Sequence, residues 1–221
     1  MTRFRLVLLS LFAVLAVGAL ASASASAEEC INGTKPVFCR ASNNTPIHLL
    51  KILGESHLSV LASTVGGAEV RIHCKDDLFR GETHLLALIL AEIDFLGCTV
   101  EKPANCTVGG ANKLILANAS VQLLPGLMPA LGLATGTGTG VPEEFTSVTF
   151  AGATCVIVGT FTISGLQPLE FPNGETGSVD HEIVAKKANS KLKLGSEPAS
   201  FSSIALVHLH SLESWLIMLG V

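Results

Sequence analysis

The sequence predicts an all-β protein, a sandwich or barrel-like domain of short antiparallel strands preceded by a signal-peptide helix. Three observations support this prediction. Apolar and polar residues alternate in several stretches, glycine-containing turns separate these stretches, and no long amphipathic helix pattern occurs. About nine short strands divided in this way are typical of a sandwich or a barrel.

Residues 1–27 are the predicted signal peptide. Arg3 and Arg5 precede an apolar stretch from Leu6 to Leu20, and the small residues Ala25–Ala27 form a cleavage signal. The apolar stretch is shorter than the roughly 20 residues that a membrane-spanning helix needs. We therefore expect export, removal of this segment, and no stable membrane anchor after cleavage. The expected location is extracellular or in the cell envelope.

Cysteine use agrees with export. Six cysteines follow the predicted cleavage site, and an even number in an exported chain indicates disulfides. Six cysteines can pair in many ways, and the sequence alone does not choose among them. Short separation along the chain favours three pairs: Cys30 with Cys39, Cys74 with Cys98, and Cys106 with Cys155.

The chain divides into two expected parts after the signal peptide. Residues 28–56 are an N-terminal extension that includes the possible Cys30–Cys39 loop, and residues 57–221 are the β-rich domain. A Gly/Thr-rich tract at 134–142 is expected to be a flexible loop. Two segments are ambiguous, because 85–91 is continuously apolar and 123–133 is interrupted by prolines; for the first we favour a strand over a short helix.

The clearest strand pattern lies around Cys74. Val70, Ile72 and Cys74 alternate with polar residues after a Gly-Gly pair, which predicts a β-hairpin. Asp76 and Asp77 follow directly, where a solvated turn is expected. Further along the chain, Gly97 is expected to form a bulge within a strand from 93 to 100, and residues 154–164 are expected to form another strand.

Composition excludes some partners. The chain has 14 Lys and Arg against 18 Asp and Glu, one Trp and no Tyr. Such a chain lacks both the basic patch and the row of aromatic rings that nucleic acids require. We therefore expect no nucleic-acid partner; the actual partner is not indicated by the sequence.

Three motifs carry a family resemblance: a strand ending in cysteine, VRIHC, the later FLGC motif, and the block FAGATCVIVGT at 150–160. In these motifs the sequence resembles a large group of uncharacterised exported proteins of high-GC Gram-positive bacteria. It covers about residues 57–185. It implies a secreted β-domain with no assigned activity.

No catalytic or cofactor-binding residue is indicated. A thiol nucleophile at Cys74 would need a histidine within hydrogen-bond reach, but on a strand His73 points to the opposite face. The motifs GxSxG, HExxH and CxxC do not occur. Cys74 is therefore expected to be a structural disulfide partner.

The remaining candidate site is a metal site. His208 and His210 are two apart on a predicted strand, so they point the same way, as in many zinc half-sites. His181 or Glu182 would be the third ligand. The alternative is that both histidines end an apolar stripe and bind nothing.

Three functions remain open. The first is a non-enzymatic secreted or cell-envelope β-domain with a structural or binding role. The second is a metal-binding or metal-dependent domain that uses His208 and His210. The third is a binder of apolar small molecules, suggested by the 48% hydrophobic content. A dry apolar cavity would favour the third function, and a filled core would count against it.

Overall fold

The computed structural model describes residue 30 and residues 35–84, 87–110, 112–125, 129–137 and 144–218. Strands dominate this part of the chain, which confirms the predicted all-β fold. The predicted signal-peptide helix at 1–27 lies outside the described residues. So do residues 138–142 of the expected Gly/Thr loop.

The chain forms short to medium strands, two of them 13 residues long. In chain order they are β1 (Val37–Arg40), β2 (Lys51–Ser56), β3 (Ser59–Val65), β4 (Ala68–Cys74), β5 (Asp76–His84), β6 (Leu88–Leu96), β7 (Thr99–Lys102), β8 (Ile115–Leu124), β9 (Ala130–Gly136), β10 (Glu144–Phe150), β11 (Gly159–Phe171), β12 (Asp180–Ala185), β13 (Lys191–Leu194), β14 (Glu197–Leu209) and β15 (Trp215–Met218).

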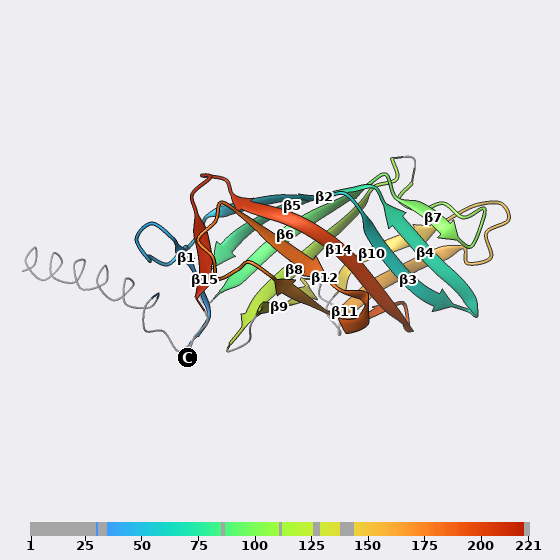
Figure 1. Cartoon of the computed structure of the whole chain (residues 1–221). Helices are drawn as coiled ribbons and strands as arrows, with labels where there is room; N and C mark the ends of the chain where they lie inside the picture. Colours follow the sequence, from blue (N-terminus) through green and yellow to red (C-terminus); the bar gives the residue numbers. More distant parts are fainter. Residues whose placement is uncertain are drawn as a thin grey trace, which may run out of the picture.

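Antiparallel pairing closes one part of the main sheet into a ring. Each strand in the order β2, β5, β6, β8, β9, β11, β12, β14 pairs with the next, and β14 pairs back with β2. Ring closure leaves these strands without free edges in this region. The result is the barrel-like form of the predicted fold (Figure 1).

The long strands β11 and β14 continue beyond the ring. Their other halves pair with β13, while β10 borders β11 and the β3–β4 hairpin borders β14. β7 then pairs with β4. The molecule is therefore elongated, with the β3–β4 hairpin at the end opposite to β1 and β15 (Figure 1).

Alternation along the strands sorts side chains between interior and surface. On β8, for example, Ile115, Ala117 and Ala119 are buried while Leu116 and Asn118 are exposed. This is the period of two that a pleated strand imposes. The interior side chains form two clusters, one near β15 and one near the β3–β4 hairpin.

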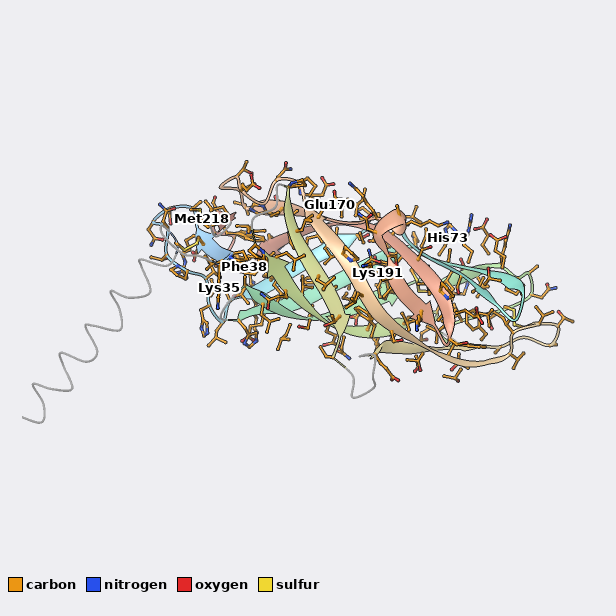
Figure 2. All side chains as sticks on the ribbon, turned by 90° about the horizontal axis from the view of Figure 1, so that it is seen from below. Lys35, Phe38, His73, Glu170, Lys191 and Met218 are labelled. Atoms are coloured by element: carbon orange, nitrogen blue, oxygen red, sulfur yellow. A yellow bond between two sulfur atoms is a disulfide. The ribbon has the colours of Figure 1, made fainter. Side chains whose placement is uncertain are left out.

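The small sheet of β1 and β15 covers one end of the ring. Trp215 and Ile217 of β15 and Phe38 of β1 are buried within the first cluster, where they contact side chains of the ring strands. The rings of Phe38 and Trp215 meet edge to face with centroids 5.7 Å apart. We call β1 and β15 the end cap. Figure 2 places Phe38 and Met218 at this end and His73 near the other.

All three favoured disulfide pairs form, so the prediction from spacing is confirmed. Cys30–Cys39 anchors residue 30 to β1. Cys74–Cys98 joins the end of β4 to the link between β6 and β7. Cys106–Cys155 joins two connections that meet through a single bridge between Thr107 and Ala151. Disulfides thus reinforce places where strand pairing is sparse.

Several predicted elements have other boundaries. β2 belongs to the ring, so the β-rich unit includes residues 51–56, which the sequence assigned to an extension. Residues 134–136 lie in β9, because backbone pairing with β11 and β8 overrides their glycine content. Gly97 separates β6 from β7 with a φ of +62° rather than forming a bulge. Residues 154–158 precede β11, which begins at Gly159.

Other predictions hold. The hairpin at Gly66 and Gly67 forms, and both glycines have positive φ values of 55° and 83°, which only glycine adopts without strain. The favoured strand within 85–91 is confirmed from Leu88 onward, where β6 begins; residues 85 and 86 lie outside the described part of the chain.

Candidate functional site: an apolar cavity with a buried carboxyl group

An apolar cavity of about 150 Å³ lies between the two clusters and is partly open to solvent, since the exposed residue Glu55 is part of its lining. Both clusters contribute side chains to its wall. Those from the cap side are Ile89, Val121 and Ile183, and those from the other side are Ile72, Ile115 and Ile163. The core is therefore incompletely filled at the middle of the molecule.

Aromatic rings form part of the cavity wall. Phe95 on β6 and Phe201 on β14 meet edge to face, with centroids 5.8 Å apart and planes at 81°. This arrangement is the favoured geometry for an aromatic pair. Because neither ring can collapse into the space without losing this contact, the pair helps to keep the cavity open.

One carboxyl group faces this apolar interior. Asp77 is the second residue of β5 and has the same parity as Phe79, so the pleat directs both inward. Asp77 is only 4% exposed and lines the cavity. A carboxyl group in such surroundings is costly unless hydrogen bonds compensate for its lost hydration.

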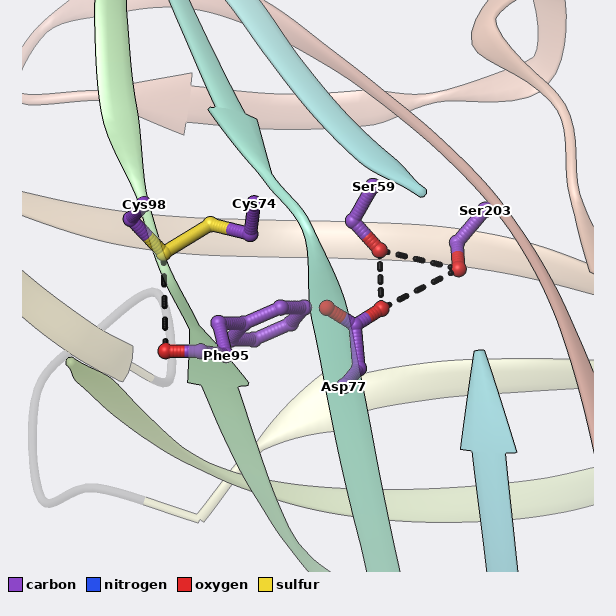
Figure 3. The surroundings of a disulfide bond; sticks show 6 residues. All are labelled: Ser59, Cys74, Asp77, Phe95, Cys98 and Ser203. Atoms are coloured by element: carbon purple, nitrogen blue, oxygen red, sulfur yellow. Dashed lines mark hydrogen bonds between the residues drawn. A yellow bond between two sulfur atoms is a disulfide. The ribbon is translucent and has the colours of Figure 1, made fainter. Parts of the chain in front are cut away.

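Serine hydroxyls supply part of that compensation. Ser59 on β3 and Ser203 on β14 both donate to Oδ2 of Asp77, the second at 3.4 Å. The hydroxyl oxygen of Ser203 also lies 3.0 Å from that of Ser59 and 2.9 Å from that of Ser56. These three serines and Asp77 form a polar cluster from four strands, which we call the Asp77 cluster. Figure 3 shows Asp77 with Ser59 and Ser203.

The second carboxyl oxygen of Asp77, Oδ1, lacks the hydrogen bonds that Oδ2 accepts. Oδ1 is buried and has no hydrogen-bond partner among the described residues, and it points toward the ring of Phe95 (Figure 3). Burial raises the pKa of Asp77 above its ordinary value, and hydrogen bonds from the serines lower it only in part. The group therefore binds a proton more readily than an exposed aspartate.

A second polar side chain lines the cavity. Gln167 on β11 is 3% exposed, and its Nε2 donates to the carbonyl oxygen of Pro168 at 2.9 Å. Its Oε1 is buried without a partner in the described part of the chain. The cavity thus combines a largely apolar wall with two unpartnered oxygen acceptors.

The histidines proposed as metal ligands do not converge. His208 lies on the outer face of β14, and His210 is exposed just beyond that strand, whereas His181 on β12 is fully buried inside the ring. The prediction that His181 completes this site is therefore wrong. No group of three or more His, Cys, Asp or Glu side chains suited to a metal occurs among the residues described.

The alternative interpretation of these histidines fits the structure. Ile204 and Leu206 share their outer face and are 59% and 55% exposed, so an apolar stripe does lead to His208 and His210. Nδ1 of His208 lies 3.7 Å from the carboxylate of Asp180.

The predicted solvated turn at Asp76 and Asp77 is also wrong. Both residues belong to β5, and only Asp76 faces outward, beside His57. The sequence contained a signal for this, because Asp77, Phe79, Gly81 and Thr83 form a small or apolar series opposite to Leu78, Arg80, Glu82 and His84. By contrast, the expected separation of His73 from Cys74 is confirmed.

The comparisons with known proteins add no relative. No protein-family model, curated protein or solved structure matches the chain. In the described residues, no helix has the length and apolar character needed to cross a membrane. The three disulfides fit an oxidising environment.

The fold and the cavity together define the class of protein. The chain is a disulfide-bonded, barrel-like antiparallel β-protein with a capped end and an internal apolar cavity. Among the described residues, Asp77 is the one buried carboxyl residue in the cavity wall.

Proposed function

We propose that this chain is an exported, non-enzymatic protein that binds a small apolar molecule in its internal cavity. The observation that carries the proposal is the cavity of about 150 Å³ with an almost wholly apolar wall. An apolar cavity of roughly this size stays dry and takes up molecules such as benzene or xenon. Transfer of an apolar molecule from water into it is favourable because the molecule loses its contact with water.

The surrounding architecture supports a binding role. Small-molecule sites are concave, mostly apolar and equipped with a few polar groups, which corresponds to this cavity with Asp77 and Gln167 in its wall. The ring of strands holds the wall in place, and the end cap separates one end from solvent. The structure thus favours the third of the functions that the sequence left open. The predicted signal peptide and the three disulfides support export.

The test is the binding of ethylbenzene to the purified, disulfide-intact chain. Calorimetry measures the affinity, and thermal unfolding measures the melting temperature at each ligand concentration. Because a ligand that binds only the folded state stabilises it, we expect the melting temperature to rise with ligand concentration. Ala117→Leu fills part of the cavity, since Ala117 is buried in its wall. This variant should bind ethylbenzene at least tenfold more weakly.

A matched control adds the same side chain to the other face of β8. Asn118 is exposed beside Ala117, so Asn118→Leu should leave ethylbenzene binding unchanged. Absence of binding to the wild-type chain, or equal binding by wild type and Ala117→Leu, would contradict the proposed function.

A further inference from the structure

The Asp77 cluster is difficult to explain as a purely structural feature. Two of its hydroxyl groups satisfy Oδ2 of Asp77, but Oδ1 is buried beside the cavity with no partner in the described chain. Leaving a buried acceptor unpaired costs free energy. A chain that needed only a packed interior at this position would be more stable with an apolar side chain here.

The position of Asp77 places its unpaired oxygen where a ligand in the cavity could reach it. Only 4% of the surface of Asp77 is exposed, and the residue lines the same cavity as Phe95 and Phe201. A molecule in the cavity would therefore have apolar walls around most of its surface and an oxygen acceptor at one place. Such a wall selects a ligand with one polar group.

Resting on the proposed function, we propose that the ligand carries a hydroxyl group that hydrogen-bonds to Oδ1 of Asp77, so that small apolar alcohols are the preferred class.

The choice of a hydroxyl group follows from the chemistry of the acceptor. A hydroxyl can donate to an ionised carboxylate and can accept from a protonated carboxyl group, so it pairs with Asp77 in either state. Burial favours the protonated state of Asp77. A carboxylate ligand would be repelled by ionised Asp77, and an ammonium group would have to give up its own hydration inside an apolar wall.

The experiment compares two ligands of nearly equal shape, benzyl alcohol and ethylbenzene, which differ by a hydroxyl in place of a methyl group. The measured quantity is the ratio of the dissociation constant of benzyl alcohol to that of ethylbenzene. Asp77→Leu removes the acceptor while keeping a side chain of similar size. Because one buried hydrogen bond is lost, we expect this ratio to rise about tenfold.

Asp76→Leu is the matched control. It removes a carboxyl group one residue away on the outer face of the same strand, so the ratio should equal that of the wild type. A wild-type measurement avoids dependence on variant folding: the carboxyl ¹³C resonance of Asp77 should shift with benzyl alcohol by more than it does with ethylbenzene.

The outcomes separate this inference from the proposed function. If neither compound binds the wild-type chain, both proposals are wrong. If both compounds bind but Asp77→Leu has the wild-type ratio, or if the Asp77 resonance responds equally to both, only the hydroxyl assignment is wrong. Benzylamine binding that depends on Asp77 and is tighter than that of benzyl alcohol would also overturn this assignment.

Discussion

Nε2 of His181 donates a hydrogen bond to the carbonyl oxygen of Trp215 at 2.7 Å, and the two rings lie with centroids 4.1 Å apart. His181 belongs to the ring strand β12 and Trp215 to the end cap, so this contact joins the cap to the ring. Because a carbonyl oxygen can only accept, Nε2 carries the proton. Nδ1 is buried without a hydrogen-bond partner among the described residues.

The burial of His181 predicts acid sensitivity, and its hydrogen bond to Trp215 acts in the opposite direction. Burial lowers the pKa of His181 below its ordinary value of 6.5. The unfolded chain therefore takes up a proton at this residue before the folded chain does, and the free energy of unfolding falls as pH drops below about 6.5. The loss is at most about 1.4 kcal/mol per pH unit and ends below the folded-state pKa.

Urea unfolding at pH 7.5 and pH 5.5 checks this prediction. His181→Gln keeps a hydrogen-bond donor but cannot be protonated, so it should lose less stability between the two pH values than the wild type. His208→Gln, at a histidine on the outer face, serves as the control and should behave like the wild type. Equal pH dependence in all three chains would show that His181 is not the group responsible.

A second prediction concerns the end cap itself. Trp215 is fully buried and its Nε1 donates to the carbonyl oxygen of Val179 at 3.2 Å. Trp215→Ala should lower the free energy of unfolding by about 3 to 5 kcal/mol, because it leaves a cavity and an unpaired carbonyl group. Leu212→Ala, in the connection before β15, should cost little since Leu212 is 62% exposed. Chemical denaturation measures both, and similar small losses would mean that the cap packs loosely.

A third prediction follows from the raised pKa of Asp77. The folded chain binds a proton at this residue more readily than the unfolded chain, so its contribution to stability decreases as pH rises above the unfolded value near 3.8. Asp77→Asn cannot ionise. The free energy of unfolding of this variant minus that of the wild type should therefore be larger at pH 7 than at pH 4.

Unfolding curves at these two pH values provide the measurement. Asp76→Asn, at the outward-facing neighbour, should show no comparable change relative to the wild type. If the stability difference between Asp77→Asn and the wild type is the same at both pH values, burial does not perturb the carboxyl group.

A fourth prediction ranks two of the disulfides. In the chain-entropy model a cross-link stabilises more when it closes a longer loop. The separations are 49 residues for Cys106–Cys155 and 9 for Cys30–Cys39. Replacing both cysteines by serine should cost about 4 kcal/mol for the first pair and about 2.6 kcal/mol for the second. Denaturant unfolding of the two variants gives the order, and a larger loss for Cys30–Cys39 would contradict it.

Local patterns explain what the sequence could predict. The alternation at Val70, Ile72 and Cys74 reports strand and face directly, since neighbouring side chains on a strand point to opposite sides. Short separations between cysteines favoured the three disulfide pairs that form. These features depend on residues close together in the chain.

The remaining features depend on distant pairings. Ring closure needs β14 to pair with β12 on one side and β2 on the other, and no local pattern encodes that choice. The cavity is what the packed side chains leave unfilled, so it follows from the sum of many contacts. Asp77 was assigned to a turn because two adjacent aspartates are typical of turns, whereas the pairing of β5 with β2 and β6 continues the strand through them.

The most direct test of the central claim is a crystal structure of the chain under xenon pressure, because xenon enters dry apolar cavities without needing any polar contact. The account predicts xenon between Phe95, Ile115 and Phe201, in the part of the cavity wall that the second cluster forms. A structure in which side chains fill this space, or in which ordered water and no xenon occupies it, would contradict the claim that the chain has a binding cavity for apolar molecules.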